Sequence, residues 1–286
     1  MLSIAAYAKI NLGLEVLHKR PDGYHEINTV FSRVSLHDTV TTEHDDVISV
    51  RCLQLPHLNE HDNIVWKAAI ALKQRFSVQS GAKITIHKHI PSGAGLGGGS
   101  SDAASALLAL RKQWGLHCST TELHEIAATL GADVPFFLGS GDAAATGIGD
   151  VLSPLSLSIP LTALLVFPGI SVSTPKAYSL LRRDNTPRSG SDLLAAVPAL
   201  QSATSGKVDL PNDFEQPVFA EYPVLGSIMN ELRGDSCRAA FMSGSGSTLV
   251  ALYDTQSEAL HRAAALASVR SCVCSFIHHV EDGFRP

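Results

Sequence analysis

Long apolar runs are missing from this sequence, and their absence excludes one class of protein. No window approaches the roughly 18 uninterrupted apolar residues that a membrane-spanning helix requires. The first residues, Met1 to Ala5, also lack the basic region, apolar core and cleavage site of a secretory signal. The sequence therefore predicts a cytoplasmic protein with no membrane partner.

Cysteine is scarce and has no pattern typical of a disulfide framework or a zinc site. The cysteines are odd in number and include no Cys-x-x-Cys pair; they are Cys52, Cys118, Cys237, Cys272 and Cys274. The 13 histidines show no metal-ligand spacing with acidic partners, so a zinc centre is not expected. We expect reduced, mostly buried thiols.

An excess of positive charge is also missing. The chain has 286 residues with 22 lysines and arginines against 27 acidic residues, and the net charge is −5. The basic residues are scattered, so an extended nucleic-acid interface is not expected. Hydrophobic residues make up 45% and charged residues 17% of the chain, which is ordinary for a soluble globular protein.

A glycine-rich loop is what the sequence does have. Residues 91–102 read PSGAGLGGGSSD, follow an alternating apolar run at 82–87, and precede strong helix formers at 103–110. Glycines let successive backbone amides converge on one anion, and a helix N-terminus adds unpaired N–H groups with partial positive charge. This order of strand, loop and helix predicts a phosphate-binding site.

Several well-known motifs do not fit this loop. Its glycines match the spelling of the dinucleotide fingerprint, but the acidic residues about 20 positions on, Glu122 and Glu125, fall inside a predicted helix. A Walker loop would need a lysine, and this loop has none. The signatures of protein kinases and the Gly-x-Ser-x-Gly of serine hydrolases are absent from the sequence. Positive charge for a phosphate must therefore come from outside the loop.

Two polar residues stand on an otherwise apolar face of the first predicted strand, residues 3–17. They are Lys9 and Asn11, two positions apart. A lone lysine there could reach water at a strand edge, whereas two inward polar residues also suit a lined pocket. The residues alone leave both interpretations open.

The remaining pattern predicts two domains, residues 1–155 and 156–286. Helices are expected at 62–76, from the capping box of Ser119 and Glu122 to Leu130, from Asn212 capping onto the Glu215 amide, and at 257–269. One strand is expected to follow Asp133 directly and to run to Leu138. Further strands are expected in a hairpin-like crossing at 141–155, at 161–167, and after a glycine-serine loop within 241–252. The polar residues 182–190 are predicted to form a surface loop.

Three blocks of the sequence resemble the three motifs of the GHMP small-molecule kinases. They are AYAKINL at 6–12, PSGAGLGGGSS at 91–101 and MSGSGS at 242–247. Further segments resemble the branch of the family that acts on a cytidine diphosphate ester of methylerythritol: RPDGYHE at 20–26, LGADVPF at 130–136, TGIG at 146–149, PG at 168–169 with TP at 174–175, NTP at 185–187 and NDFE at 212–215. The resemblance implies an α+β protein with the two-domain GHMP kinase fold. Its N-terminal domain would resemble the second domain of ribosomal protein S5, its C-terminal domain would be ferredoxin-like, and the active site would lie between them.

The resemblance also implies a reaction, in which ATP phosphorylates the 2-hydroxyl of the methylerythritol moiety in the non-mevalonate isoprenoid pathway. Asp133 resembles the catalytic base and Lys9 its partner; a carboxylate can receive the hydroxyl proton and an ammonium can steady the transferring group. Asp133 alone could be a turn residue before Val-Pro, but Lys9 and the matched motif favour the catalytic role. Mg²⁺ is expected as the metal, with Ser101 as a candidate ligand and the other ligands open.

The resemblance assigns the binding residues as well. For ATP they are Asn63 and Lys88 near the adenine, with the loop residues Pro91, Ser92, Gly93, Ala94, Gly95, Leu96, Gly97, Gly98, Gly99, Ser100 and Ser101. Asn63 is equally plausible as a helix cap. For the substrate they are Tyr24 and Tyr178 sandwiching the cytosine, His25 at its edge, Asn11 on the erythritol, and Thr174.

Two alternatives stay open. Another kinase of the same family would act on homoserine, mevalonate or a sugar, although Tyr24 and His25 would then have no nucleobase to hold. A non-catalytic nucleotide-binding sensor is the other alternative, and the presence of both Lys9 and Asp133 speaks against it. The oligomeric state is left between a monomer and a weak dimer.

Overall fold

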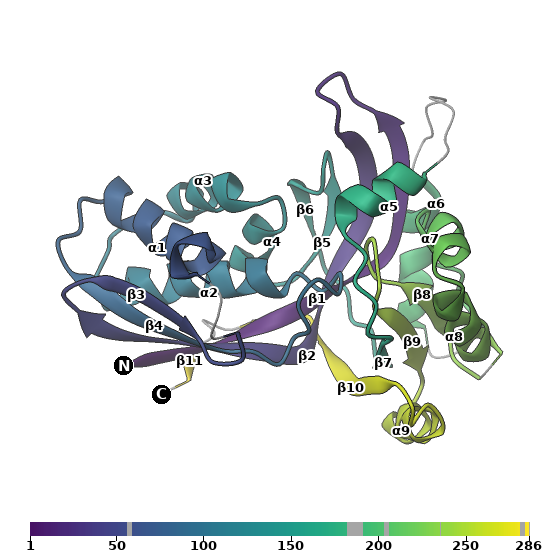
Figure 1. Cartoon of the computed structure of the whole chain (residues 1–286). Coiled ribbons are helices and arrows are strands. Elements are labelled where there is room, and N and C mark those ends of the chain that lie inside the picture. Colours follow the sequence, from purple (N-terminus) through teal and green to yellow (C-terminus); the bar gives the residue numbers. More distant parts are fainter. Residues whose placement is uncertain (56–58, 182–190, 203–205, 235, 281–283, 286) are drawn as a thin grey trace.

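A computed structural model describes residues 1–55, 59–181, 191–202, 206–234, 236–280 and 284–285. Figure 1 shows two lobes joined by the long strands β1 (Leu2–Lys19) and β2 (His25–Asp45). The described strands form one 11-stranded sheet whose main path is β11-β1-β2-β10-β7-β9-β8. The surface loop predicted at 182–190 lies outside the described residues.

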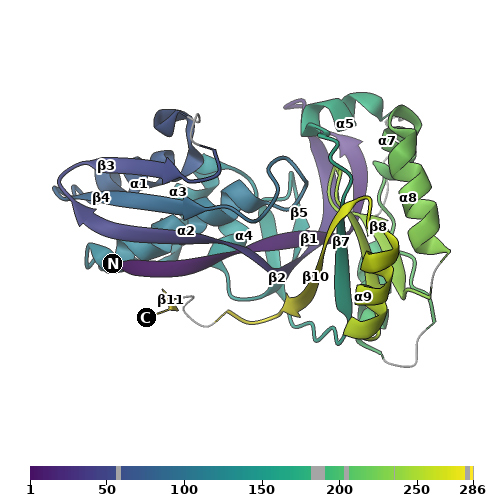
Figure 2. The same cartoon turned by 60° about the horizontal axis from the view of Figure 1, so that its bottom comes forward.

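The N-terminal lobe places helices on one face of its part of the sheet (Figures 1 and 2). Its further strands are β3 (Ile48–Cys52), β4 (Gly81–His87), β5 (Asp142–Thr146) and β6 (Val151–Leu155). Its helices are the 3₁₀ turn η1 (Glu60–Asp62), α1 (Ile64–Arg75), α2 (Gly98–Gln113), α3 (Thr120–Leu130) and α4 (Val134–Leu138). Buried residues of α2 pack in one core with Leu72 of α1 and Ile84 of β4; those of α2 are Ala103, Ala106, Leu107 and Leu110. This packing fixes the start of α2, where the glycine loop ends.

The C-terminal lobe has ferredoxin-like topology. Strands β7 (Thr162–Phe167), β8 (Ala239–Met242), β9 (Leu249–Tyr253) and β10 (Arg270–Ile277) are ordered β10-β7-β9-β8, with only antiparallel pairs. The helices are α5 (Thr174–Leu180), α6 (Ser191–Ala196), η2 (Val197–Gln201), α7 (Glu215–Glu221), α8 (Pro223–Arg233) and α9 (Gln256–Ala265). The short strand β11 (Phe284–Arg285) returns to the edge of β1. The expected α+β architecture and the ferredoxin-like C-terminal domain are confirmed.

The hairpin of β1 and β2 belongs to both lobes. Leu14, Val16 and Ile27 pack in the C-terminal core with Leu164 and Val166. Gly13, at φ +85°, lies at a register shift of the β1–β2 ladder, between the two parts of the strand. The domain boundary at residue 155 stays a prediction. Strands β1 and β2 precede this boundary in the chain, yet their residues pack in the cores of both lobes.

Most predicted elements have the expected bounds, and one is of the wrong type. The capping box of Ser119 and Glu122 is present, and the helix that it begins ends before Gly131. Residues 134–138 were expected as a strand and form helix α4 instead. Asp133 and, in the first turn, Pro135 are helix-start signals that outweighed the apolar run. Because four successive residues, 134–137, are buried, the segment also lacks the periodicity that distinguishes a helix from a strand.

The predicted cap at Asn212 also differs in detail. Its side chain accepts a hydrogen bond from the backbone N–H of Phe214 at 2.9 Å, not from that of Glu215. Its amide group donates to the carbonyl oxygens of Met242 and Gly244, at 2.6 and 2.8 Å. Asn212 therefore fixes the glycine-serine loop after β8 as well as the turn before α7.

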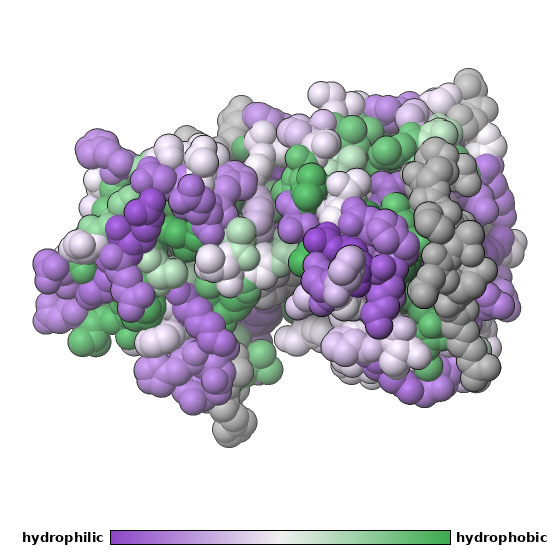
Figure 3. Space-filling view, turned by 90° about the horizontal axis from the view of Figure 1, so that it is seen from above, coloured by the Kyte–Doolittle hydropathy of each residue, from purple (hydrophilic) through white to green (hydrophobic). Residues whose placement is uncertain are grey.

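Seen from above, Figure 3 shows hydrophobic residues only as small separate patches among hydrophilic ones. Among the described helices, none is long and apolar enough to cross a membrane.

Candidate active site

The glycine loop folds against the loop that follows β8. Gly93, Gly95 and Gly97 all have positive φ, which other residues adopt only with strain. A Cβ on Gly95 would lie 2.5 Å from the carbonyl oxygen of Ser243, so only glycine fits there. The Ser243 hydroxyl donates to the carbonyl oxygen of Gly95 at 3.1 Å. The glycine loop and the loop after β8, which are distant in sequence, are thus in direct backbone contact.

One side of the glycine loop borders a cavity of about 470 Å³ at the N-terminus of α2. The predicted ATP residues that line it are Asn63, Lys88 and every loop residue from Pro91 to Ser100. The side chain of Asn63 also accepts a hydrogen bond from the Val65 N–H at 2.9 Å and so caps α1. Both sequence interpretations of Asn63 are compatible with this placement. Ser101 does not line this cavity.

Lys88 is held in a buried charge cluster on the wall of this cavity. Its Nζ donates to Asp102 at 2.7 Å and to Asp38. Burial alone would lower the pKa of Lys88, but the two carboxylates outweigh it and raise that pKa. Burial raises the pKa of Asp102 to about 7, although Lys88 opposes the shift. The cluster ties the end of β4 to β2 and to the first turn of α2.

The other side of the glycine loop borders a smaller cavity of about 160 Å³. Gly95 and Gly97 line this cavity as well as the larger one. The predicted residues that meet here are Lys9, Asn11, Asp133, Thr174 and Tyr178. The loop therefore separates two adjoining cavities and is shared by both.

Lys9 and Asp133 form an ion pair in the smaller cavity. The Lys9 ammonium lies 3.7 Å from Oδ2 of Asp133 and donates to Oδ1 of Asn11 at 2.7 Å. It also lies 4.7 Å from the ring centre of Phe31. Asn11 in turn donates to Thr29 at 2.9 Å, which fixes the orientation of its amide. Lys9 is only 5% exposed, so it is a pocket residue and not an edge lysine reaching for water.

Asp133 stands directly before α4 and makes no side-chain capping bond to it. A third of its side chain is exposed, whereas the Lys9 side chain is almost fully buried. The carboxylate is therefore oriented by Lys9 and remains accessible from the cavity.

The aromatic residues of the predicted base site are only partly brought together. His25 stacks on Tyr178 with ring centres 4.8 Å apart and planes at 19°, and Phe214 packs perpendicular to Tyr178 at 4.9 Å. Burial raises the pKa of Tyr178 to about 12. Tyr24 lies in the β1–β2 turn, is 62% exposed and lines neither cavity. The sandwich of the cytosine between Tyr24 and Tyr178 stays a prediction.

Several residues of the smaller cavity had not been assigned from the sequence. They are Leu14, Ile27, Phe31, Ile148, Phe214, Gly244 and Ser245. Gly244 and Ser245 belong to the third motif, so the glycine-serine pattern could have pointed to them. The apolar residues carry no such signal, because in sequence they look like any core residue.

Comparisons with known proteins agree with this geometry. The chain matches the family described as "GHMP kinases N terminal domain" at residues 63–149 and "GHMP kinases C terminal" at 196–270. A relative from Chlorobium chlorochromatii (strain CaD3), named 4-diphosphocytidyl-2-C-methyl-D-erythritol kinase, is 43% identical over 89% of each chain.

Solved structures agree too. One titled "Crystal structure of 4-(cytidine 5'-diphospho)-2C-methyl-D-erythritol kinase" has a TM-score of 0.84 at 35% identity and covers 96% of this chain and 98% of its own. A homoserine kinase from Cytophaga hutchinsonii shares the fold alone, with a TM-score of 0.69 at 17% identity over 99% of this chain and 96% of its own. The chain therefore belongs to the GHMP kinases and, within them, to the family of 4-diphosphocytidyl-2-C-methyl-D-erythritol kinases.

Proposed function

We propose that this enzyme transfers the γ-phosphoryl group of ATP to the 2-hydroxyl of 4-(cytidine 5'-diphospho)-2-C-methyl-D-erythritol, a step in non-mevalonate isoprenoid precursor synthesis. The observation that carries the proposal is the shared glycine loop. Its residues Gly95 and Gly97 line both cavities, so ATP phosphates bound on one side meet an alcohol on the other.

The chemistry of the smaller cavity suits transfer to an alcohol. The acceptor oxygen forms a bond to the γ-phosphorus as the bond to ADP breaks, and the hydroxyl proton passes to the Asp133 carboxylate. The Lys9 ammonium lies beside that carboxylate and stabilises the charge on the transferring group. The N–H groups at the start of α2 bind the ATP phosphates.

Magnesium is the metal that we propose for the reaction. Mg²⁺ takes oxygen ligands, commonly one or two carboxylates plus substrate phosphates. Asp102 lies on the wall of the 470 Å³ cavity in which we place ATP, the nucleotide cavity. Its Oδ1 is buried without a hydrogen-bond partner among the described residues. Asp102 fits as the carboxylate that would hold the ion, better than Ser101, which lines a different cavity. When bound, Mg²⁺ neutralises charge on the β- and γ-phosphates.

We assign the cytidine to the aromatic residues beside the smaller cavity. Tyr178 is fixed by Phe214 on one side and covered by His25 on the other. The cytosine takes the place of His25 on the Tyr178 ring, and His25 then meets the edge of the base. The β1–β2 hairpin places Tyr24 over the other face of the cytosine. Asn11 and Thr174 contact the erythritol portion of the substrate.

A substrate panel tests the proposal. Purified protein is incubated with ATP and Mg²⁺ and with one of three acceptors: the cytidyl substrate, mevalonate or homoserine. ADP release measures turnover, and ³¹P NMR identifies the phosphorylated product. We expect turnover with the cytidyl substrate and a new phosphate monoester resonance. Turnover only with mevalonate or homoserine would assign the chain to another kinase activity, and ATP binding with no turnover would support a sensor.

Two further predictions concern the cellular setting. We propose that the enzyme acts in the cytoplasm on its small-molecule substrate, without nucleic-acid or membrane partners. Its oligomeric state, a monomer or a weak dimer, stays a prediction that sedimentation velocity at several concentrations can decide.

A further inference from the structure

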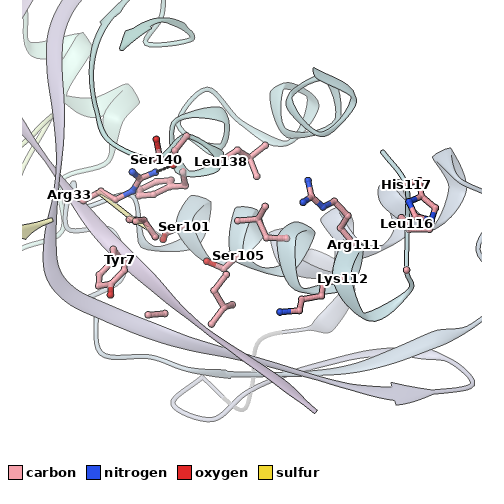
Figure 4. Close-up of a pocket in the computed structure, with 17 residues that line it drawn as sticks. Tyr7, Arg33, Ser101, Ser105, Arg111, Lys112, Leu116, His117, Leu138 and Ser140 are labelled. Atoms are coloured by element: carbon pink, nitrogen blue, oxygen red, sulfur yellow. Dashed lines mark hydrogen bonds between the residues drawn. The ribbon is translucent and has the colours of Figure 1, made fainter. Parts of the chain in front are cut away.

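A third cavity, of about 530 Å³, borders helix α2 on a different face from the nucleotide cavity. Figure 4 shows it between α2, the first strands and the chain that follows α4. Helix α2 contributes one row of side chains spaced three or four residues apart: Ser101, Ser105, Leu108 and Lys112. The nucleotide cavity is lined instead by Gly98, Gly99, Ser100 and Asp102 of the same helix.

Positive charge gathers at one end of this cavity. Arg111, Lys112 and His117 line that end, opposite Arg33 and Ser140 (Figure 4). None of the described lining residues is acidic. Between the ends lies an apolar wall that includes Ile4, Leu108, Leu116, Phe137 and Leu138. The cavity therefore combines cations with an apolar interior.

Arg33 closes the other end and is already fully engaged with the protein. Its guanidinium donates to the carbonyl oxygens of Phe136 and Gly139, each at 2.8 Å, and lies 4.6 Å from the ring centre of Phe136. Arg33 thus forms part of the wall, and a ligand's charge would be met at the end formed by Arg111.

Basic residues in the last turn of a helix stabilise the helix by themselves, so the charge alone would not indicate a ligand. A second observation does. Ser101 is 1% and Ser105 6% exposed, and neither hydroxyl has a hydrogen-bond partner in the described part of the chain. Both serines line the cavity, so their hydroxyls are available there to donate hydrogen bonds to the oxygen atoms of a ligand.

We propose that this cavity binds a small organic anion with an apolar body, of the alkyl phosphate or carboxylate type, separate from the substrates of the reaction. Arg111 and Lys112 supply the positive charge, and His117 lies at the same end of the cavity. Ser101 and Ser105 supply hydroxyl donors, and the leucines bury the apolar part. Because the first turn of α2 also borders the nucleotide cavity, a ligand here lies next to the ATP site without entering it.

Calorimetric titration with hexyl phosphate tests the site, on full-length protein saturated with ADP so that the phosphate-binding loop is occupied. Inorganic phosphate and hexanol are titrated in parallel. We expect saturable binding of hexyl phosphate at least about tenfold tighter than either, since it alone has both parts. Equal affinity for inorganic phosphate, or binding that disappears when ADP saturates the enzyme, would overturn the proposal.

Two variants locate the binding. Leu108→Trp fills the cavity and Arg111→Ala removes a cation; each should weaken hexyl phosphate binding by about tenfold or more. Arg51→Ala, at an exposed arginine of β3, is the matched control and should bind as the unmodified protein does. Unchanged binding in both test variants places the anion elsewhere. The ADP affinity of each variant verifies folding, and because no acceptor is used, the outcome is independent of the proposed function.

Discussion

Asp133 owes its accessibility to its place just before a short helix. A carboxylate at a helix N-terminus usually turns back to cap the free N–H groups, but Asp133 does not. Lys9, arriving from β1, draws the carboxylate toward the cavity instead. An acidic residue that is positioned yet still reachable is what a general base requires.

Asp133→Asn should therefore lower kcat by about 10²–10⁴-fold, the usual contribution of a general base, and leave the affinity for ATP unchanged. The measurement pairs steady-state kinetics with nucleotide titration. Asp46→Asn, in the exposed turn between β2 and β3, is the control and should keep full activity. An equal loss of ATP binding in Asp133→Asn would make the residue structural.

Tyr178 is the other residue whose role can be separated by kinetics. Tyr178→Ala should raise KM for the cytidyl substrate by about 5- to 150-fold, the equivalent of about 1–3 kcal/mol of base stacking. KM for ATP should stay the same. Tyr178→Phe keeps the ring and should bind the substrate nearly as well. If the alanine variant shows an unchanged KM, the base is not stacked on this ring.

At the scale of elements, the junction between the glycine loop and α2 depends on backbone shape. Gly97 precedes the helix at φ +66°, and a Cβ there would lie 2.9 Å from the Phe137 ring and 3.1 Å from Lys9. Gly99 lies inside the helix, where a Cβ would meet only Ile64 at 3.8 Å. The two neighbouring glycines thus differ in how much they tolerate a side chain.

Gly97→Ala should lower the free energy of unfolding by more than the roughly 1–2 kcal/mol that a left-handed alanine costs, because it also displaces Phe137. Gly99→Ala should be neutral or stabilise the protein by up to about 1 kcal/mol, since alanine favours a helix. Urea denaturation of both variants measures the difference. Equal stabilities would show that the loop can rearrange.

The buried cluster of Lys88, Asp38 and Asp102 joins three elements. Lys88→Met leaves two buried carboxylates without their cation and should cost about 3–5 kcal/mol. The pKa of Asp102 is already raised, to about 7, and would rise further. A raised carboxyl pKa contributes stability at low pH that is lost as the pH rises through it.

The penalty of Lys88→Met should consequently be larger at pH 8 than at pH 5, as urea denaturation at the two pH values would show. Lys83→Met, at an exposed lysine of β4, should cost less than about 1 kcal/mol at either pH. A penalty that does not change with pH would mean that Asp102 does not titrate in this range.

The sequence predicted those elements whose signals are local. The capping box of Ser119 and the alternation in β4 depend on neighbouring residues, so both were foreseen. Helix α4 was not, since it has only five residues, four of them buried, and so shows no period. The pairing of Lys9 with Asp133 came from family resemblance, because residues 124 positions apart have no local signal. The stacking of His25 on Tyr178 was missed for the same reason.

On the scale of the whole molecule, the two lobes are less separate than the chain order implies. Val16 donates its backbone N–H to Asp213 at 2.7 Å, and Leu14 donates to the carbonyl oxygen of Pro211 at 2.7 Å. Strand β10 returns to pair with β2 at Val34. The first strands are therefore bonded to the second lobe by backbone as well as by apolar packing.

The shared hairpin makes the C-terminal half an incomplete unit. A fragment of residues 156–286, expressed alone, would lack Leu14, Val16 and Ile27 of its own core and would expose the apolar surface that they cover. We expect this fragment to bind a hydrophobic dye and aggregate, and a synthetic peptide of residues 1–30 to restore a folded circular dichroism spectrum. A fragment that folds without the peptide would contradict this. If the expectation holds, the protein cannot be divided at any single peptide bond into two self-sufficient parts, since its opening segment completes the half that is made last.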